Sequence, residues 1–292
     1  MGICKGRTVI VTGAGGGLGR AYALALAEQG AAVVVNDLRA DAAQAVCEEI
    51  ERAGGRALAN ADDITRMDTA QRIVDAAQAA FGTVHALVNN AGVCRDRMFT
   101  SMTEDDWDTV MRVHLRGHFC LAQILVRGWR DAAKAGAPVA ARIVNTSSGA
   151  GLQGSIGQSN YGAAKAGIAA LTLMQAAELA RYGVSVNALA PSARTAMTET
   201  VFAEMMKKPE DGGFDAFDPA NVAPLVVWLA SEASGEVTGQ VFEVAGGMIA
   251  VAEGWRTGPR VDRGARWPAG EVGEAVTALL AQARPAQRVY GS

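Results

Sequence analysis

The sequence has no excess of charge of either sign and no long hydrophobic run. Its 27 lysines and arginines are balanced by 30 aspartates and glutamates, which gives a net charge of −3. This balance provides no electrostatic attraction to nucleic acid or to an anionic membrane surface. No apolar stretch reaches the roughly 20 residues that a membrane-spanning helix needs. We therefore expect neither a nucleic-acid partner nor a membrane partner.

Cysteine and histidine are scarce. The four cysteines (Cys4, Cys47, Cys94 and Cys120) form no CxxC pair, and the three histidines do not cluster with acids. We therefore expect free thiols and no metal site. The first strand candidate begins at Arg7, which leaves no room for a signal peptide. Together these features favour a cytoplasmic protein.

Near its start the sequence carries a glycine-rich turn. The run TGAGGGLG at 12–19 follows an apolar strand candidate and leads into a helical pattern at 18–29. Glycines let such a turn close tightly and let the backbone approach a pyrophosphate, and the helix N-terminus adds oriented N–H groups. Strand, turn and helix together predict a dinucleotide site. The residues expected to hold the dinucleotide here are Gly13, Gly17, Leu18 and Gly19.

An acid stands at the end of the second strand candidate. Asp37 lies about 20 residues beyond the glycine turn, the usual position of the carboxylate that accepts hydrogen bonds from the adenosine ribose. The 2′-phosphate of NADP would meet a like charge there, so we expect NAD as the cofactor. Arg39 is a nearby cation that could bind that phosphate instead.

Strand and helix patterns alternate along the chain. The strand candidates are 7–12, 32–37, 56–60, 86–89, 141–147, 184–190 and 240–244, and the helix candidates are 18–29, 41–52, 67–81, 104–134, 159–182 and 219–230. Most strands are continuous apolar runs, as expected when helices cover both faces of a sheet. The order predicts an α/β fold with a Rossmann-type, doubly wound parallel sheet of about seven strands.

The same pattern suggests how the chain is divided. Residues 1–250 form the expected dinucleotide-binding domain, with no internal repeat or separating linker. Residues 191–218 lack a convincing strand pattern, so we expect a substrate lid there. Residues 251–292 form a C-terminal extension with helical composition at 271–283.

Catalytic residues are indicated by Tyr161 and Lys165, which share one helix face, and by Ser148 upstream. A phenol is a poor base at neutral pH because its pKa is about 10. A nearby ammonium favours the phenolate and is expected to lower that pKa. The Ser148 hydroxyl can hydrogen-bond a carbonyl or alcohol. The trio is suited to proton transfer in an alcohol–ketone interconversion.

These motifs resemble those of the short-chain dehydrogenase/reductase family over roughly residues 5–250. The resemblance rests on the glycine turn, NNAG at 89–92, Ser148, the Tyr161–Lys165 pair and a proline after the sixth strand. Further stretches, among them NNAGVCRDRMF at 89–99 and VFEVAGG at 241–247, are similar to the dehydrogenase units of type 2 multifunctional enzymes. Those units oxidise (3R)-hydroxyacyl-CoA with NAD and accept some steroid alcohols.

The resemblance implies roles for individual residues. Tyr161 would be the general acid/base, Lys165 would lower its pKa and bind the nicotinamide ribose, and Ser148 would polarise the reacting oxygen. The further cofactor contacts implied are Asn90, Asp62 or Asp63, Pro191 and Thr195. His114 stands where many members have a catalytic Asn, and a proton-relay role and a structural role for it are both open.

The sequence therefore predicts an NAD-dependent short-chain alcohol dehydrogenase whose first substrate candidate is a (3R)-hydroxyacyl-CoA. A hydroxysteroid or steroid-derived acyl-CoA is the alternative substrate. A non-catalytic NAD-binding scaffold is the alternative from another class, because a fold alone does not fix function. The resemblance also implies a homotetramer or homodimer formed through residues 104–134 and 159–182.

Overall fold

Eight strands form one sheet in the described part of the chain, in the order β3-β2-β1-β4-β5-β6-β7-β8. The computed structural model describes residues 2–195, 206–210 and 212–292. The strands are β1 (Thr8–Thr12), β2 (Ala32–Asn36), β3 (Arg56–Asn60), β4 (Ala86–Asn89), β5 (Ala141–Thr146), β6 (Val184–Ser192), β7 (Val241–Ala245) and β8 (Met248–Val251). Strands β1 to β7 pair in parallel, and β8 pairs antiparallel with β7.

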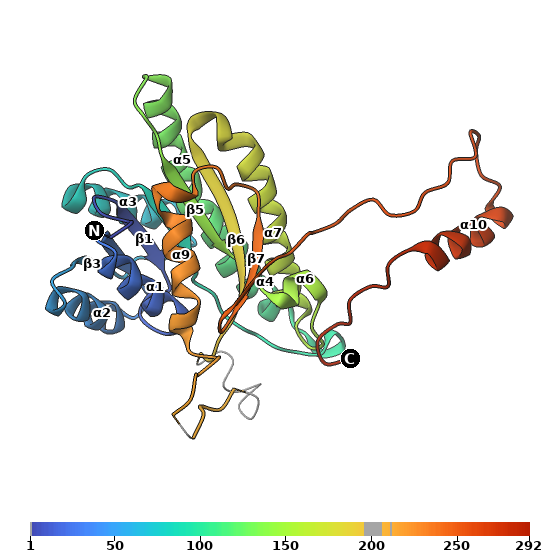
Figure 1. Cartoon of the computed structure of the whole chain (residues 1–292), viewed down its shortest axis with the longest axis horizontal. Coiled ribbons are helices and arrows are strands. Elements are labelled where there is room, and N and C mark those ends of the chain that lie inside the picture. Colours follow the sequence, from blue (N-terminus) through green and yellow to red (C-terminus); the bar gives the residue numbers. More distant parts are fainter. Residues whose placement is uncertain (1, 196–205, 211) are drawn as a thin grey trace.

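Helices cover both faces of this sheet (Figure 1). They are α1 (Gly17–Glu28), α2 (Ala40–Arg52), α3 (Met67–Phe81), α4 (Glu104–Met111), α5 (Gly117–Lys134), α6 (Gly149–Gln153), α7 (Ser159–Leu179), α9 (Ala223–Ala230) and α10 (Ala269–Gln282). Alternation within a strand sends its side chains to opposite faces. Val9 and Val11 join a core with α1, α2 and α9, whereas Ile10 joins a second core with α3, α5 and α7. Burial on both faces explains why the strands are continuously apolar.

All seven predicted strands are present, with ends within two residues of those expected. The eighth strand was missed. It follows a two-residue turn at Gly246 and Gly247, where Gly246 has a φ of 53°. A Gly-Gly pair between two apolar runs is a hairpin signal that could have revealed it.

The expectation that no strand extends past Ala190 was wrong. β6 continues to Ser192, and Pro191 pairs with Val244 in β7. On the other side, the last pairing partner in β5 is Thr146, opposite Leu189. A proline lacks the N–H donor, but here the strand has outrun one neighbour, so no ladder hydrogen bond is lost.

The helix predicted at 104–134 is interrupted. Residues Arg112–Arg116 form a π-helical turn between α4 and α5. Such turns insert an extra residue into a helix and occur frequently at functional sites. This one carries His114.

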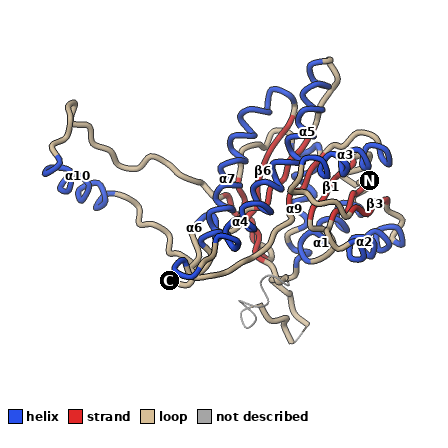
Figure 2. The backbone as a smooth tube through the Cα atoms, turned by 180° about the vertical axis from the view of Figure 1, so that it is seen from behind, coloured by secondary structure: helices blue, strands red, loops and turns tan. Residues whose placement is uncertain are grey.

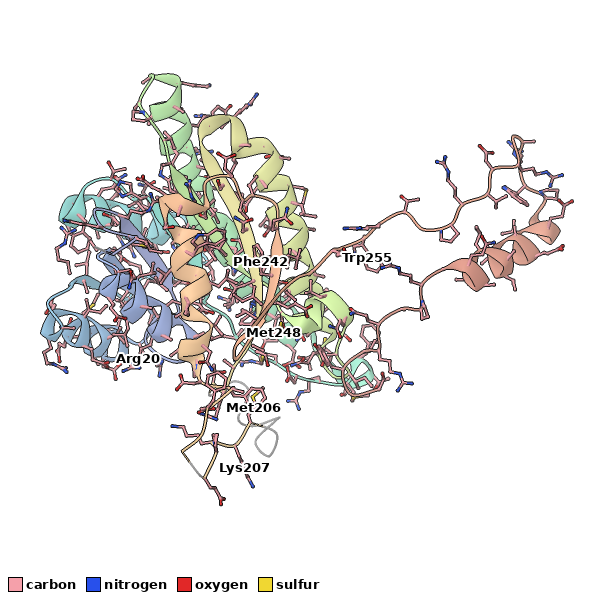
Figure 3. All side chains as sticks on the ribbon, in the orientation of Figure 1. Arg20, Met206, Lys207, Phe242, Met248 and Trp255 are labelled. Atoms are coloured by element: carbon pink, nitrogen blue, oxygen red, sulfur yellow. The ribbon has the colours of Figure 1, made fainter. Side chains whose placement is uncertain are left out.

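The C-terminal extension leaves the body after β8 as a long arm that carries α10 and returns at its tip (Figures 1 and 2). The predicted helical segment at 271–283 corresponds to α10. Trp255, near the start of the arm, is fully exposed (Figure 3).

The strand order places the expected ligand crevice. The chain winds outward from β1 to β3 on one side and from β4 to β7 on the other, so the order reverses between β1 and β4. Ligands in such sheets bind beyond the carboxyl ends of the strands at this reversal. The glycine turn follows β1 and Asn90 follows β4. None of the helices in the described residues combines the length and apolar character that crossing a membrane requires.

Candidate active site

Tyr161 and Lys165 both lie on α7, and the structure brings them together as expected. The Lys165 ammonium lies 5.5 Å from the centre of the Tyr161 ring. It donates a hydrogen bond of 2.7 Å to the Thr146 carbonyl at the end of β5. The Ser147 hydroxyl donates to the Lys165 carbonyl at 2.8 Å, which fastens α7 to the same strand end. The Tyr–Lys pair is therefore fixed to the sheet.

Ser148 completes the trio. It follows β5 directly and begins α6, where its hydroxyl accepts a hydrogen bond of 3.2 Å from the Ala150 N–H. A side-chain hydrogen bond between Ser148 and Tyr161 favours the phenolate and acts to lower the pKa of Tyr161. Two hydroxyls and a cation thus converge where an alcohol or ketone oxygen could bind.

The expected depression of the Tyr161 pKa was wrong for the chain by itself. Burial raises the pKa of Tyr161 above its usual value, and the hydrogen bond from Ser148 offsets this in part. Burial also lowers the pKa of Lys165 to about 7. The charge of the nearby ammonium therefore does not offset the cost of burying a phenolate.

His114 contacts both the tyrosine and the loop after β4. Its ring meets the Tyr161 ring edge-on, with centroids 5.3 Å apart. Its Nε2 lies 3.1 Å from the Val93 amide nitrogen and 2.8 Å from the Val93 carbonyl oxygen. Burial, with the Lys165 charge, lowers the pKa of His114 to about 3. His114 is therefore a neutral imidazole that joins the π turn to the loop.

The glycine turn has the expected shape. Gly13 and Gly17 have positive φ angles of 61° and 52°, which side chains rarely adopt. A β-carbon at Gly19 would lie 2.1 Å from the Gly13 carbonyl oxygen, so only glycine permits this closeness of turn and helix. Leu18, in the first turn of α1, packs against the core. The Asn90 amide donates to the Thr12 and Gly13 carbonyls at 3.0 and 3.2 Å, which ties the turn to the end of β4.

Asp37 lies against this turn. Its carboxylate accepts hydrogen bonds of 3.0 Å from the backbone N–H groups of Gly15 and Arg39. The Arg39 guanidinium approaches the same carboxylate at 3.4 Å, but its side chain is 67% exposed whereas that of Asp37 is 14% exposed. The less exposed partner of this ion pair is thus the acid, and the cation is at the surface.

Asp62 and Asp63 follow β3, and both carboxylates are engaged within the chain. Asp62 pairs with Arg72 and accepts from the Asn60 amide at 3.0 Å. Asp63 accepts from the backbone and hydroxyl of Thr65 at 2.8 and 2.9 Å. Both residues therefore shape the loop at the end of β3.

The predicted lid is described in part. Pro191 lies in β6, and Thr195 reaches the glycine turn, where a β-carbon at Gly17 would lie 3.3 Å from its side chain. Arg194 forms an ion pair with Asp215 and its backbone N–H donates to the Phe217 carbonyl at 2.7 Å. These contacts bring the two ends of the segment together. Residues 196–205 and 211 lie outside the described residues.

Sequence reasoning missed Asn160, which supports the site. Its side chain is buried and donates to the carbonyls of Arg95 and Asp106 at 3.0 Å each. Its oxygen accepts from the Tyr161 N–H at 2.7 Å. Asn160 thus joins the loop after β4, α4 and the start of α7. Its place directly before Tyr161 was a signal available in the sequence.

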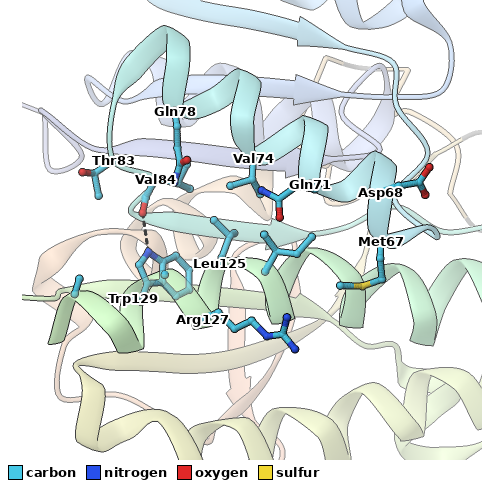
Figure 4. Close-up of a pocket in the computed structure, with 13 residues that line it drawn as sticks. Met67, Asp68, Gln71, Val74, Gln78, Thr83, Val84, Leu125, Arg127 and Trp129 are labelled. Carbon is cyan, nitrogen blue, oxygen red and sulfur yellow. Dashed lines mark hydrogen bonds between the residues drawn. The ribbon is translucent and has the colours of Figure 1, made fainter. Parts of the chain in front are cut away.

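A groove in the described part of the chain lies apart from the predicted site. This groove of about 660 Å³ lies between α3 and α5, where the Trp129 indole donates to the Val84 carbonyl at 2.8 Å (Figure 4). None of the predicted site residues lines it. Among the described residues, no three His, Cys, Asp or Glu side chains gather in a group that could hold a metal ion.

Comparison with known proteins identifies close relatives. The sequence profile of the short chain dehydrogenase family matches residues 7–206. The chain is 49% identical over 252 residues to hydroxyacyl-CoA dehydrogenase ChsB1 of Mycobacterium tuberculosis, covering 84% of this chain and 79% of that protein. It is 46% identical over 253 residues to peroxisomal multifunctional enzyme type 2 of Mus musculus. That match covers 84% of this chain and 32% of the mouse enzyme.

Two solved structures of dehydrogenases are also similar to this chain. A crystal structure of a short chain dehydrogenase from Mycobacterium avium is 52% identical, with a TM-score of 0.91 over the whole of both chains. A 7α-hydroxysteroid dehydrogenase complexed with NADH and 7-oxo glycochenodeoxycholic acid is 31% identical, with a TM-score of 0.74 over 84% of this chain and 94% of that one. With its mostly parallel sheet and its dehydrogenase relatives, this chain is an oxidoreductase that belongs to the short-chain dehydrogenase family.

Proposed function

We propose that this protein is an NAD-dependent dehydrogenase that interconverts a secondary alcohol and a ketone, with a (3R)-hydroxyacyl-CoA as its substrate. The observation that carries the proposal is the convergence of Ser148, Tyr161 and Lys165 beside the glycine turn. The names of the two relatives described above, a hydroxyacyl-CoA dehydrogenase and a multifunctional enzyme, support the substrate class. The same relationships argue against a non-catalytic scaffold.

The turn and its surroundings fit a dinucleotide. Among the described residues, no side chain caps the N-terminus of α1 and its first turn carries no acid, so its N–H groups suit a pyrophosphate. We propose that the ribose beyond it binds Asp37 and that the nicotinamide end lies between Tyr161, Lys165 and the start of the lid. When bound, the nicotinamide ring supplies hydride acceptance. The proposed cofactor contacts are Gly13, Gly17, Leu18, Gly19, Asp37, Asp62, Asp63, Asn90, Tyr161, Lys165, Pro191 and Thr195.

The chain's own residues supply the proton chemistry. The substrate oxygen would lie between the hydroxyls of Ser148 and Tyr161, because Ser148 lies close enough to Tyr161 to lower the pKa of its phenol. Tyr161, as the phenolate, accepts the alcohol proton, and Ser148 donates a hydrogen bond to the oxygen as it becomes a carbonyl. Lys165 stabilises the phenolate by its charge. In the reverse direction Tyr161 returns the proton.

We propose that His114 is a positioning residue rather than a proton relay. Its lowered pKa keeps it neutral, and its Nε2 is occupied by the Val93 backbone. Through its edge-on contact with Tyr161, His114 fixes the position of the reacting phenol relative to the π turn.

Replacing His114 tests this role. His114→Asn keeps a polar partner for the Val93 backbone, so we expect activity within about tenfold of the unmodified protein. His114→Leu leaves buried backbone groups unpaired, which costs about 1–3 kcal/mol, and should reduce activity further. The measurement is steady-state kinetics over a range of pH. We expect the apparent pKa of the pH profile to be the same in His114→Asn as in the unmodified protein. Wild-type rates in both variants would remove His114 from the account.

Cofactor preference tests Asp37. The 2′-phosphate of NADP would meet this carboxylate, and a lost charged hydrogen bond costs about 1.5–3 kcal/mol, so we expect NAD to be preferred at least tenfold in kcat/KM. Asp37→Ser should weaken NAD binding and improve NADP, with the exposed Arg39 then able to bind the phosphate. Asp41→Ser, which removes a charge from an exposed position on α2, is the matched control. Equal kcat/KM for both cofactors in the unmodified protein would contradict the assignment.

Substrate class is tested by comparing acyl thioesters with steroids. A hydroxysteroid or steroid-derived acyl-CoA is the second candidate, favoured by the structural similarity to a 7α-hydroxysteroid dehydrogenase. We expect (3R)-hydroxyacyl-CoA to give the higher kcat/KM. Higher kcat/KM with a free hydroxysteroid would instead support the second candidate.

We further propose that residues 191–218 cover the substrate and that the protein is a cytoplasmic homotetramer or homodimer assembled through residues 104–134 and 159–182. Large apolar side chains are exposed on these helices, namely Trp107, Phe119, Leu173 and Met174. Such a surface would be covered in an oligomer.

A further inference from the structure

The last residues of the chain lie on the segment that joins Ser148 to Tyr161. The arm that leaves the body after β8 comes back beside α6, and both views show the C-terminus there (Figures 1 and 2). The Tyr290 N–H donates to the Gly154 carbonyl at 3.2 Å, and the Ile156 N–H donates to the Tyr290 carbonyl at 3.0 Å. Residues 289–291 thus add a short parallel pairing to the edge of this segment.

The joining segment is built to receive this end of the chain. A β-carbon at Gly149 would lie 2.8 Å from the Tyr290 ring, and the three atoms nearest to it all belong to Tyr290. Gly149 has no positive φ, so its backbone conformation does not require glycine. Val289 lies over Gly154, 3.4 Å from the position of a β-carbon, which is an ordinary contact, and Gly154 has a positive φ of 86° that itself favours glycine. The close fit of a missing side chain to a large one is therefore that of Gly149 and Tyr290.

The opposite side of the segment is also held. The Arg97 N–H donates to the Gly157 carbonyl at 2.8 Å, and the Gln158 amide donates to Asp96 at 2.9 Å. The segment 149–158, which Tyr290 contacts at Gly149 and residues 96 and 97 contact at its end, contains four glycines. Glycine loses the most conformational freedom on folding, so such a segment needs external contacts to keep one conformation.

We propose that residues 289–291 position Ser148 for catalysis by holding the segment 149–158 in place, with Tyr290 as the main contact. This inference rests on the proposed role of Ser148 toward the substrate oxygen. Ser148 is the residue from which α6 begins, so any displacement of Gly149 displaces its hydroxyl relative to Tyr161. The arm therefore serves to bring the end of the chain to its own active site.

The extension has a counterpart in a relative. The Mycobacterium avium enzyme matches this chain over the whole of both chains with a TM-score of 0.91. Residues 252–292 are about a seventh of this chain, so a score above about six sevenths requires part of the arm to superpose as well. The two proteins thus share at least part of the course of this arm.

The experiment compares Tyr290→Ala with Tyr290→Phe, which keeps the ring, and with Trp255→Ala, which removes an exposed ring from the same arm. Hydrogen–deuterium exchange in peptides covering 149–158 should be at least about fivefold faster in Tyr290→Ala and unchanged in the other two. With a hydroxyacyl-CoA, kcat should fall about tenfold or more because a small misplacement of a catalytic group is costly. The dissociation constant of NADH should be unchanged.

A second substitution tests the contact from its other side. Gly149→Ala should displace the Tyr290 ring and speed exchange in the same peptides, and adding Tyr290→Ala should then have little further effect. Unchanged exchange in Tyr290→Ala would overturn the proposed contact. Faster exchange with an unchanged kcat would overturn the positioning role. If the unmodified protein oxidises no alcohol, the proposed function fails, but the exchange results still decide whether the end of the chain holds the segment.

Discussion

Tyr161→Phe is expected to abolish turnover while leaving NADH binding nearly unchanged. The substitution removes the group that accepts and returns the proton, which typically contributes about 10²–10⁴-fold to a rate. It keeps the partly buried ring and its edge-on contact with His114, so the fold and the crevice should be preserved. Neither Cys94 nor His114 is suited to replace the phenol as a base, because burial raises the pKa of the Cys94 thiol to about 12 and His114 is bound to the Val93 backbone. The Lys165 amine is held by the Thr146 carbonyl.

Steady-state kinetics together with NADH fluorescence titration checks this result. Tyr182→Phe is the matched control, since that ring lies beyond α7 under the Arg181 guanidinium and should tolerate the change. We expect kcat to fall at least about a thousandfold in Tyr161→Phe, within the range for a lost acid/base. Retention of more than a few per cent of the wild-type kcat would refute the assignment of Tyr161.

Lys165→Met is expected to give the second largest loss. At 5.5 Å from the Tyr161 ring centre, the ammonium stabilises a phenolate by about 3 kcal/mol if the effective dielectric constant is about 20. Alcohol oxidation needs the phenolate, so its rate should rise with pH. Burial raises the pKa of Tyr161 and lowers that of Lys165 to about 7, so the charge of Lys165 acts on the phenol at and below neutral pH. Removing the cation should therefore lower the rate most at and below neutral pH.

The measurement is the pH dependence of kcat/KM in Lys165→Met, in Lys165→Arg and in the unmodified protein. Lys165→Met should lower the rate at neutral pH about a hundredfold, as a loss of about 3 kcal/mol implies. Lys165→Arg keeps the charge but changes its geometry at the Thr146 carbonyl. Its rate should lie between that of Lys165→Met and that of the unmodified protein. A pH profile that is identical in Lys165→Met and the unmodified protein would show that Lys165 does not influence the ionisation of Tyr161.

The parts of the fold that follow from local sequence were predictable. Apolar runs marked seven strands, and the glycine turn, Asp37 and Asn90 occupy the crevice that a doubly wound sheet creates. The Tyr161–Lys165 spacing placed both residues on one helix. These features depend on chain order, helix periodicity and the steric properties of glycine.

The features that were missed depend on contacts between distant parts of the chain. The π turn at Arg112–Arg116 has no local signal, and its His114 is held by Val93. The pKa of Tyr161 depends on burial in the folded chain, which a four-residue spacing does not reveal. The pairing of Tyr290 with Gly154 and Ile156 joins the end of the chain to its middle, so helical composition at 271–283 gave no indication of it.

The most direct test of the account is NADH formation from NAD and the two enantiomers of a 3-hydroxyacyl-CoA, recorded by ultraviolet absorbance with the unmodified protein and Tyr161→Phe side by side. We expect NADH to form from the (3R) enantiomer with the unmodified protein, the (3S) enantiomer to react far more slowly, and Tyr161→Phe to form none. Equal NADH formation by the two proteins would contradict the proposed site, and no NADH from either enantiomer would contradict the proposed function.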